Sequence, residues 1–356
     1  MNVLFLTLTP VVGVAGTIAW TWYAGFHLWM PLLMIGMYAA VGISITAGYH
    51  RFFSHKSYEA SAPLQLFYAF FGAMAAQNSI LWWSSSHRVH HKYADKDWDP
   101  YNIRRGFWWA HMFWIFYRNE ERDESFSNSP DLLANPIVMW QHRWHKAILI
   151  LGGFGIPTLI GAAFGNPLAG LLWGGFTRIV VIHHTTFFVN SLAHSWGKPV
   201  FNAEASARDN YWVALVTLGE GFHSFHHRFP ADFRNGIRWY DWDPAKWWIR
   251  GLKLVGLASD LTQTPLPQIE QARMRAALRL VEAKIEVANG TLADEARRRL
   301  KNAARHLEKA IALWRRAVEE QAAKNTVWRE MHRRSRQHVR HSRRHWKRAV
   351  RMLQAA

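Results

Sequence analysis

The chain has 356 residues and no cysteine, which excludes disulfides, thiolate-bound zinc and iron–sulfur clusters. A bound metal must therefore use imidazole, carboxylate or water, and the chain contains 20 histidines. The net charge of +18 is uneven: residues 271–356 hold 23 Lys/Arg against 8 Asp/Glu, or +15, and the remainder holds 20 against 17, or +3. These numbers predict two regions with different physical properties.

The first 50 residues contain no Asp, Glu, Lys or Arg. At about 1.5 Å per helical residue, this length can cross a roughly 30 Å hydrocarbon core twice. We predict two membrane spans at 3–25 and 28–48, with a short turn near Gly25. A cleaved signal peptide is not expected, because the stretch is too long and lacks a basic start.

The next uncharged stretch, residues 60–87, is also long enough to span. If it crossed the membrane, however, the histidines before and after it would lie on opposite faces. We therefore predict an interfacial or re-entrant segment at about 62–83. The polar residues Gln77, Asn78 and Ser79 near its end favour that interpretation.

A third uncharged tract covers 147–197 and is interrupted only by Arg178. Its Gly165-Asn166-Pro167 sequence is typical of a turn, so we predict spans at 147–164 and 168–189. Basic residues flank both hairpins on one side, which places the active face and both termini in the cytosol by the positive-inside rule. These residues are Arg51, Lys56, Arg143, Lys146 and Lys198. We expect a multi-pass protein of a bacterial inner membrane.

The composition changes at Pro265, where charged helical patterns replace apolar ones. We predict a membrane domain at 1–262 and a basic extension at 265–356 made of two or three amphipathic helices. Thr291, followed by Asp294 and Glu295, is a good helix start. The predicted fold is an all-α integral membrane protein with four transmembrane helices, a cytosolic helical cap and this extension.

Three groups of histidines stand out in the sequence. Two have the spacing i, i+3, i+4, which places three imidazoles on one side of a helix. The spacing i, i+5 of the other group fits a helix end, where the chain leaves the second span. Two such helices facing each other can enclose a pair of metal ions. The groups are His50 and His55; His87, His90 and His91; and His223, His226 and His227.

Two alternatives account for these histidines less well than a two-metal site does. One is histidines without a metal, and the other is a haem. Surface or core histidines without a ligand rarely repeat this spacing, and a haem needs only one or two axial histidines. Ligating histidines usually donate their second N–H to a carboxylate or carbonyl. Asp99 and Glu220 are the carboxylates predicted for this role, whereas Asp95 and Asp97 fit solvated loop charges equally well.

Four motifs resemble those of the membrane acyl-CoA desaturase family, in its delta-9, stearoyl-CoA desaturase-like branch of bacterial type. They are Gly48-Tyr-His-Arg-Phe-Phe-Ser-His55, His87-Arg-Val-His-His-Lys-Tyr93 with its sequel Arg104-Arg-Gly-Phe107, Asn190-Ser-Leu-Ala-His194, and Gly219-Glu-Gly-Phe-His-Ser-Phe-His-His-Arg-Phe-Pro230. They occur in the family order, and the resemblance covers about residues 25–258.

The resemblance implies four transmembrane helices under a cytosolic cap that holds two Fe²⁺ ions, with O₂ as co-substrate. It adds His194 as a ninth ligand, a choice that spacing alone does not make over His183 or His184. Asn190 would act through a water. The implied ligands are His50, His55, His87, His90, His91, His194, His223, His226 and His227.

For the substrate, the resemblance points to Asn78, Trp83 and Arg118, although Trp83 fits an interfacial anchor equally well. Relatives usually carry a charged residue just before the second histidine motif, where this chain has Ser84-Ser85-Ser86. The acyl carrier is therefore left open between coenzyme A, acyl carrier protein and phospholipid.

The expected reaction is O₂-dependent delta-9 desaturation of a saturated acyl chain, with no catalytic residue beyond the metal centre. An acyl or alkane hydroxylase with the same kind of site is an alternative, as is a non-catalytic membrane adaptor acting through the basic tail. A ferredoxin-like or cytochrome electron donor must be external, and a basic face with Arg104, Arg105, Arg228 and Arg234 can dock it. For the tail, membrane lipid is a better candidate partner than nucleic acid.

Overall fold

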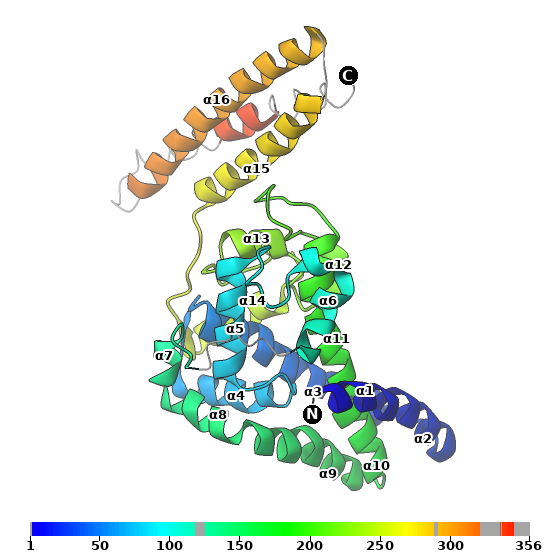
Figure 1. Ribbon diagram of the computed structural model, residues 1–356. Helices are drawn as coiled ribbons and strands as arrows, with labels where there is room; N and C mark the ends of the chain where they lie inside the picture. Colours follow the sequence, from blue (N-terminus) through cyan, green and yellow to red (C-terminus); the bar gives the residue numbers. More distant parts are fainter. Residues whose placement is uncertain (1, 118–124, 288–290, 321–334, 336, 345–356) are drawn as a thin grey trace. The chain divides into compact units, whose positions relative to one another are not determined.

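The computed structural model describes residues 2–117, 125–287, 291–320, 335 and 337–344 (Figure 1). The described chain is mostly helical and divides into two compact units. The large unit comprises Met1–Lys198 and Ser206–Gln263, and the small unit comprises Pro199–Ala205 and Thr264–Ala356.

The first two apolar stretches of the large unit are continuous helices. Val3–Ala24 is built from α1 (Asn2–Pro10), the π-helical η1 (Val11–Gly16) and α2 (Thr17–Ala24), and it ends at Gly25, whose φ is +86°. Trp29–Ser54 is built from α3 (Trp29–Ile43) and the π-helical η2 (Ser44–Ser54). At 22 and 26 residues with mean hydropathy of 1.9 and 1.7, both are long and apolar enough to cross a membrane.

Pro136–Ala163 is a third helix of this kind, with 28 residues and a mean hydropathy of 1.7. It consists of α8 (Pro136–Ile148), the π-helical η5 (Leu149–Gly155) and α9 (Ile156–Ala163). After a turn at Gly165 the chain returns through α10 (Pro167–Gly170), the π-helical η6 (Leu171–Thr177) and α11 (Arg178–Ser195). By length and composition, three of the described helices can cross a membrane.

The returning helix carries a buried cation, Arg178. Its guanidinium donates hydrogen bonds to the backbone carbonyls of Gly153, Gly174 and Met74. The Met74 carbonyl lies at the end of α4 (Ala62–Ala73), where unpaired carbonyls give a helix a partial negative charge. Arg178 thereby ties the end of α4 to two other helices.

The segment expected at the interface is α4 followed by a break. Ala76 and Asn78 have φ of +55° and +77°, and α5 (Ile80–Tyr93) then begins with Ser79 as its N-cap. At about 1.5 Å per residue, α4 is about 18 Å long and therefore too short to cross a roughly 30 Å hydrocarbon core.

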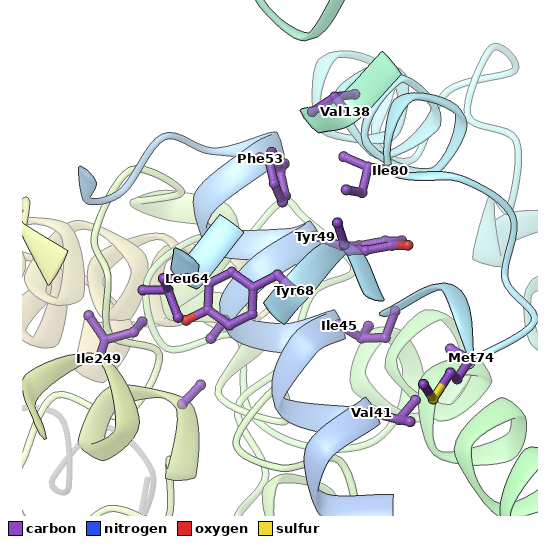
Figure 2. Packing of buried hydrophobic residues seen from close by; sticks show 14 of the residues in the cluster. Val41, Ile45, Tyr49, Phe53, Leu64, Tyr68, Met74, Ile80, Val138 and Ile249 are labelled. Atoms are coloured by element: carbon purple, nitrogen blue, oxygen red, sulfur yellow. The ribbon is translucent and has the colours of Figure 1, made fainter. Parts of the chain in front are cut away.

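The core of the large unit forms where α4 packs against η2. Figure 2 shows Tyr49 and Tyr68 in this cluster, with Ile249 beside Leu64. The contact is so close that a Cβ on Gly72 would lie 2.2 Å from the Tyr49 ring, and one on Gly48 would lie 2.6 Å from the Tyr68 ring. Glycine at these two positions lets α4 approach the helix that carries the first two histidines.

Short elements complete the large unit. A two-stranded antiparallel sheet pairs β1 with β2 in the register Glu59↔Ser259, a small departure from the all-α prediction. The remaining elements are β1 (Glu59–Ala60), η3 (Ile103–Arg105), α6 (Phe107–His111), η4 (Phe113–Phe116), α7 (Pro130–Leu133), α12 (Tyr211–Val216), α13 (His223–Arg228), α14 (Pro244–Leu254) and β2 (Ala258–Ser259).

The small unit is helical, with α15 (Leu266–Val287) and α16 (Thr291–Glu320), and residues 337–344 are also helical. It has its own apolar core, which includes Met274, Leu307, Ile311, Trp314 and Val339. The predicted basic extension at 265–356 ends in an arginine-rich stretch, residues 333–351, that lies partly outside the described residues.

Candidate metal centre

Nine histidines from four elements converge in the interior of the large unit. They come from η2 and its C-cap, from α5, from α11 and from α13. In each of two groups, the nitrogen atoms lie within 4.8 Å of one another. The first group is His50, His55, His87, His91 and His226, and the second is His90, His194, His223 and His227. The structure thus brings together the nine histidines named from the sequence.

The local helix form explains why these spacings work. On α5 and α13 the i, i+3, i+4 pattern places three imidazoles on one side. The i, i+5 pair needs a different geometry, and η2 supplies it, because a π-helix bonds residue i to i+5. The His55 N–H donates to the His50 carbonyl at 3.2 Å. The pair lies at a helix end, as the spacing indicated, with His55 as the C-cap of η2, and the π-helical form of that end brings the two residues together.

Polar partners orient three of the rings through Nδ1. His50 Nδ1 lies 3.0 Å from Glu220 Oε2, and His90 Nδ1 lies 2.9 Å from Asp99 Oδ1. His194 Nδ1 lies 2.6 Å from Ser206 Oγ. A carboxylate accepts a hydrogen bond from Nδ1–H in such a pair, and in the neutral ring this leaves the Nε2 lone pair of His50 and His90 free for a metal. Glu220 and Asp99 occupy the positions expected of the supporting carboxylates.

The Nε2 atoms face one another across each group. In the first group, His50 and His226 are 2.9 Å apart, and His55 and His87 are also 2.9 Å apart. In the second, His194 and His223 are 3.0 Å apart, and His90 and His227 are 3.2 Å apart. Lone pairs converging in a buried space favour a cation, so the donor set fits two metal ions that accept imidazole ligands.

The histidines are held in the form that binds metal. Burial, followed by the nearby histidines, lowers the pKa of His223 to about 3 and holds the pKa of His87, His91, His226 and His227 well below the ordinary value. A metal ligand must be deprotonated. These rings are therefore neutral near pH 7, and protons do not compete with a metal ion for their nitrogen atoms.

Glu220 is buried, and its negative charge is fully surrounded by donors. Besides His50, it accepts hydrogen bonds from Arg51 at 3.1 Å and from the Asn235 side chain at 2.7 Å. Burial raises the pKa of Glu220, but His50 and Arg51 lower it by more than burial raises it. The net result is a pKa below the ordinary value. Glu220 is therefore a carboxylate, and Arg51 also pairs with buried Asp243 at 2.8 Å.

The residues behind this carboxylate were not predicted from the sequence. Arg51 and Asn235 stabilise Glu220 from the far side, Asp243 accepts hydrogen bonds from both of them, and Ser206 holds His194. Asp95, which fitted a loop charge equally well, accepts from the Ser206 backbone at 2.7 Å. One signal was present: Arg51 is the first charged residue of the chain and directly follows His50.

The predicted substrate residues lie in different surroundings. Trp83 stacks on His87 with ring centroids 5.0 Å apart, and its Nε1 donates to Gln77, so it contacts the histidines directly. Asn78 accepts from the Ser79 backbone. Asn190 is half-buried on α11, one turn before His194. Arg118 lies outside the described residues.

One expectation about the surface was wrong. Arg234, assigned to a basic docking face, is 7% exposed, and its Nε and Nη2 donate to the two oxygens of the Asp232 carboxylate, each at 2.8 Å. The sequence shows both residues, but only the folded turn shows that Arg234 pairs with Asp232 and is therefore not available to a docking partner. His183 and His184 also lie outside the two groups: His183 binds the Ala75 carbonyl and His184 binds His111.

Comparison with known proteins agrees with this geometry. The family model described as fatty acid desaturase matches residues 4–255. The chain is 42% identical over 279 residues to acyl-CoA desaturase 1 of Saccharomyces cerevisiae, covering 76% of this chain and 53% of the relative. It is 36% identical over 258 residues to stearoyl-CoA desaturase 5 of Bos taurus, covering 69% and 76%.

A third relative is the sn-2 palmitoyl-lipid 9-desaturase of a Nostoc species, 34% identical over 269 residues, covering 74% of this chain and 90% of the relative. The chain spans about half the length of the two yeast relatives, at 53% and 49%. The match covers the histidine motifs and the helices that carry them. This chain belongs to the fatty acid desaturase family.

Proposed function

We propose that this chain is an O₂-dependent fatty acyl desaturase that removes two hydrogens from adjacent methylene groups of a saturated chain. The observation that carries the proposal is the pair of adjacent, buried histidine groups with inward-facing nitrogens. The names of its relatives, which include acyl-CoA desaturases and a palmitoyl-lipid 9-desaturase, support an acyl substrate and the delta-9 position.

The metal ions proposed for the two groups are Fe²⁺. His50, His55, His87, His91 and His226 would hold one ion. His90, His194, His223 and His227 would hold the other, with Asn190 completing its shell through a water. When bound, the iron ions supply the oxidising chemistry that unactivated C–H bonds require and that no acid, base or nucleophile provides.

The residues of the chain position this centre and balance its charge. The histidine ligands are neutral, so the nearby Glu220 and Asp99 carboxylates offset part of the metal charge and fix His50 and His90. Trp83 forms an aromatic wall against His87. We propose that the acyl chain passes this wall and that Asn78, Trp83 and Arg118 contribute to substrate binding.

Coenzyme A is the proposed acyl carrier, because both yeast relatives, at 42% and 46% identity, carry the name acyl-CoA desaturase, one of them as probable. The three serines before the second histidine motif do not replace a charged contact. Ser84 donates to the Tyr49 carbonyl and Ser85 to the Asn128 side chain, so their hydroxyls bind the protein interior. Cationic contacts to phosphate would have to come from elsewhere, and Arg118 is the proposed source.

The proposed topology has four spans, with α10 to α11 as the fourth, and places the histidines and both termini in the cytosol. The basic residues flanking both hairpins support this orientation. Electrons are proposed to come from an external acidic ferredoxin or cytochrome. Arg104 and Arg228 remain candidates for its docking face, whereas Arg105 stacks on Trp109 at 3.6 Å.

The test is expression of the full chain in a host whose acyl lipids are profiled, with the position of new double bonds determined. We expect new monounsaturated chains with the double bond at carbon 9, and none from His226→Ala expressed at the same level. New alcohols without double bonds would support the hydroxylase instead. A folded, purified chain that binds no iron would overturn the proposal.

A further inference from the structure

We propose that the exposed side of α14 is a second membrane-contact surface, which lies in the interfacial layer of the bilayer that the apolar helices cross. This α14 surface consists of Trp247 and Leu254 of the helix, its C-cap Val255, and Trp239 and Tyr240 from the turn before it, where the Trp239 carbonyl accepts a hydrogen bond from Trp247. The proposal concerns membrane attachment and does not depend on the proposed reaction.

The residues of this surface are unusually exposed for their type. Leu254 is 88% exposed, Trp239 is 77% exposed and Val255 is 68% exposed. Trp247 and Leu254 are seven residues apart on one side of the helix, whereas Ala245 and Ile249 on the other side are buried. Large exposed apolar patches mark interaction sites, and this one lies outside the three candidate spans.

The contacts on the buried side of α14 show which helices α14 packs against. Ala245 and Ile249 are buried in the apolar cluster of the large unit, and α14 contacts both α3 and η2, the two parts of the span Trp29–Ser54. Figure 2 shows Ile249 next to Leu64 of α4. In addition, Trp248 Nε1 donates to the Tyr68 hydroxyl of α4 at 3.1 Å. The helix therefore packs on the end of a span and on the apolar helix that is too short to cross.

This placement makes the α14 surface continuous with the membrane-embedded part of the chain. Because α4 fits the interface by its length and composition, a helix packed on α4 beside the end of a span lies at a similar depth. Its unpacked side then has two possible surroundings, water or lipid. Leucine and valine exposed to this degree favour lipid.

The chemistry of the surface fits the interfacial layer better than the hydrocarbon core or a protein partner. Tryptophan and tyrosine concentrate where one end of the ring meets water and the other meets apolar groups. Cations surround the apolar centre: Arg238 donates to the Tyr240 hydroxyl at 3.0 Å, and Lys253 is exposed. Such residues extend their charged ends toward lipid phosphates.

The absence of cysteine from the chain makes the test direct. Single-cysteine variants Trp247→Cys and Leu254→Cys, labelled with a nitrobenzoxadiazole dye, would be reconstituted as full chains into phosphatidylcholine–phosphatidylglycerol vesicles. Trp22→Cys, in the first span and 91% exposed, is the membrane control. Trp98→Cys, 53% exposed in the loop beyond α5, is the aqueous control.

We expect lipids with a nitroxide near the headgroup to quench the labels at 247 and 254, and aqueous iodide to quench the label at 98. Iodide quenching of 247 and 254 equal to that of 98, with no quenching by lipid, would overturn the proposal. Protection from both quenchers would mean that protein covers the surface, which also overturns it. The quenching measurements do not depend on activity. If the wild-type chain formed no desaturated product, the proposed reaction would fail but this test of membrane contact would still apply.

Discussion

Histidines occur in both units of the molecule but serve different purposes in them. In the large unit, nine are gathered in two groups with their nitrogens facing inward. In the small unit, His306, His338 and His341 are exposed and belong to neither group. The residue type is the same, so the surroundings decide whether an imidazole is a candidate ligand or a surface group.

The cations show the same contrast. In the large unit, Arg51 is buried between two carboxylates and Arg178 is buried among backbone carbonyls. On α16, Lys301, Arg305 and Lys309 are exposed at four-residue spacing, opposite the buried Leu307 and Ile311. Burial makes Arg51 and Arg178 depend on specific partners, whereas the exposed cations of α16 are solvated by water and screened by salt.

The largest expected effect comes from removing a ligand. His226 faces His50 at 2.9 Å and His91 at 3.0 Å, so His226→Ala should abolish iron binding in the first group and reduce desaturation to background. The measurement is iron per chain by elemental analysis, together with product analysis. His306→Ala in the small unit is the matched control and should retain full iron content. Equal iron in both variants would refute the ligand assignment.

A smaller effect is expected from removing the charge behind His50. Glu220→Gln keeps the shape but loses the carboxylate that His50, Arg51 and Asn235 share. Loss of such a supporting partner typically weakens metal affinity about 10–100-fold. Iron retention during dialysis against a graded chelator would measure the change, with exposed Glu308→Gln as control. Identical retention in the two variants would contradict the role of Glu220.

Acid should destabilise the large unit, which contains the buried histidines. The pKa of His223 is lowered to about 3 by burial, against about 6.5 in an unfolded chain, so the unfolded state binds more protons between these values. The contribution of His223 to the stability of the metal-free large unit is therefore fully present above pH 6.5 and is lost as the pH falls toward 3. Thermal unfolding of metal-free protein at stepped pH tests this, and a midpoint unchanged from pH 7 to 5 would count against it.

The smallest effect on the metal centre is expected from the core of the small unit. Leu307 is 3% exposed, and Leu307→Ala should destabilise that unit by about 2–5 kcal/mol through lost burial and a cavity. Because its apolar cluster is separate from that of the large unit, iron content should not change. Limited proteolysis would report loosening of α15 and α16. A fall in iron content alongside that loosening would show that the units are coupled.

Several features of the site were predictable because they depend on spacing along one element. The imidazoles of His87, His90 and His91 share a side of any α-helix, whatever it packs against. Glu220 and Asp99 were found as carboxylates close in sequence to histidine motifs. His194 required the family resemblance, because His183 and His184 on the same helix are chemically equivalent until the fold separates them.

Further features of the site depend on partners distant in the sequence and could not be read from it. Ser206 is a support for His194 only because the loop containing it returns to α11. Arg51 reaches Asp243 across 192 positions. Even a close neighbour in the sequence gives no pairing by itself: Arg234 looked like a docking residue because only the folded turn brings its Nε and Nη2 onto the Asp232 carboxylate.

The sequence by itself determined that the chain has apolar helices long enough to cross a membrane, a separate basic extension and three histidine groups in a desaturase-like order. The helices, the extension and the histidine spacing follow from local composition and helical periodicity, whereas the desaturase-like order follows from the family resemblance. The tertiary structure alone decided how the nine rings divide between two groups, that a π-helix brings His50 and His55 together, and which side of α14 is left uncovered. These properties depend on contacts between distant segments, which form only when the chain folds.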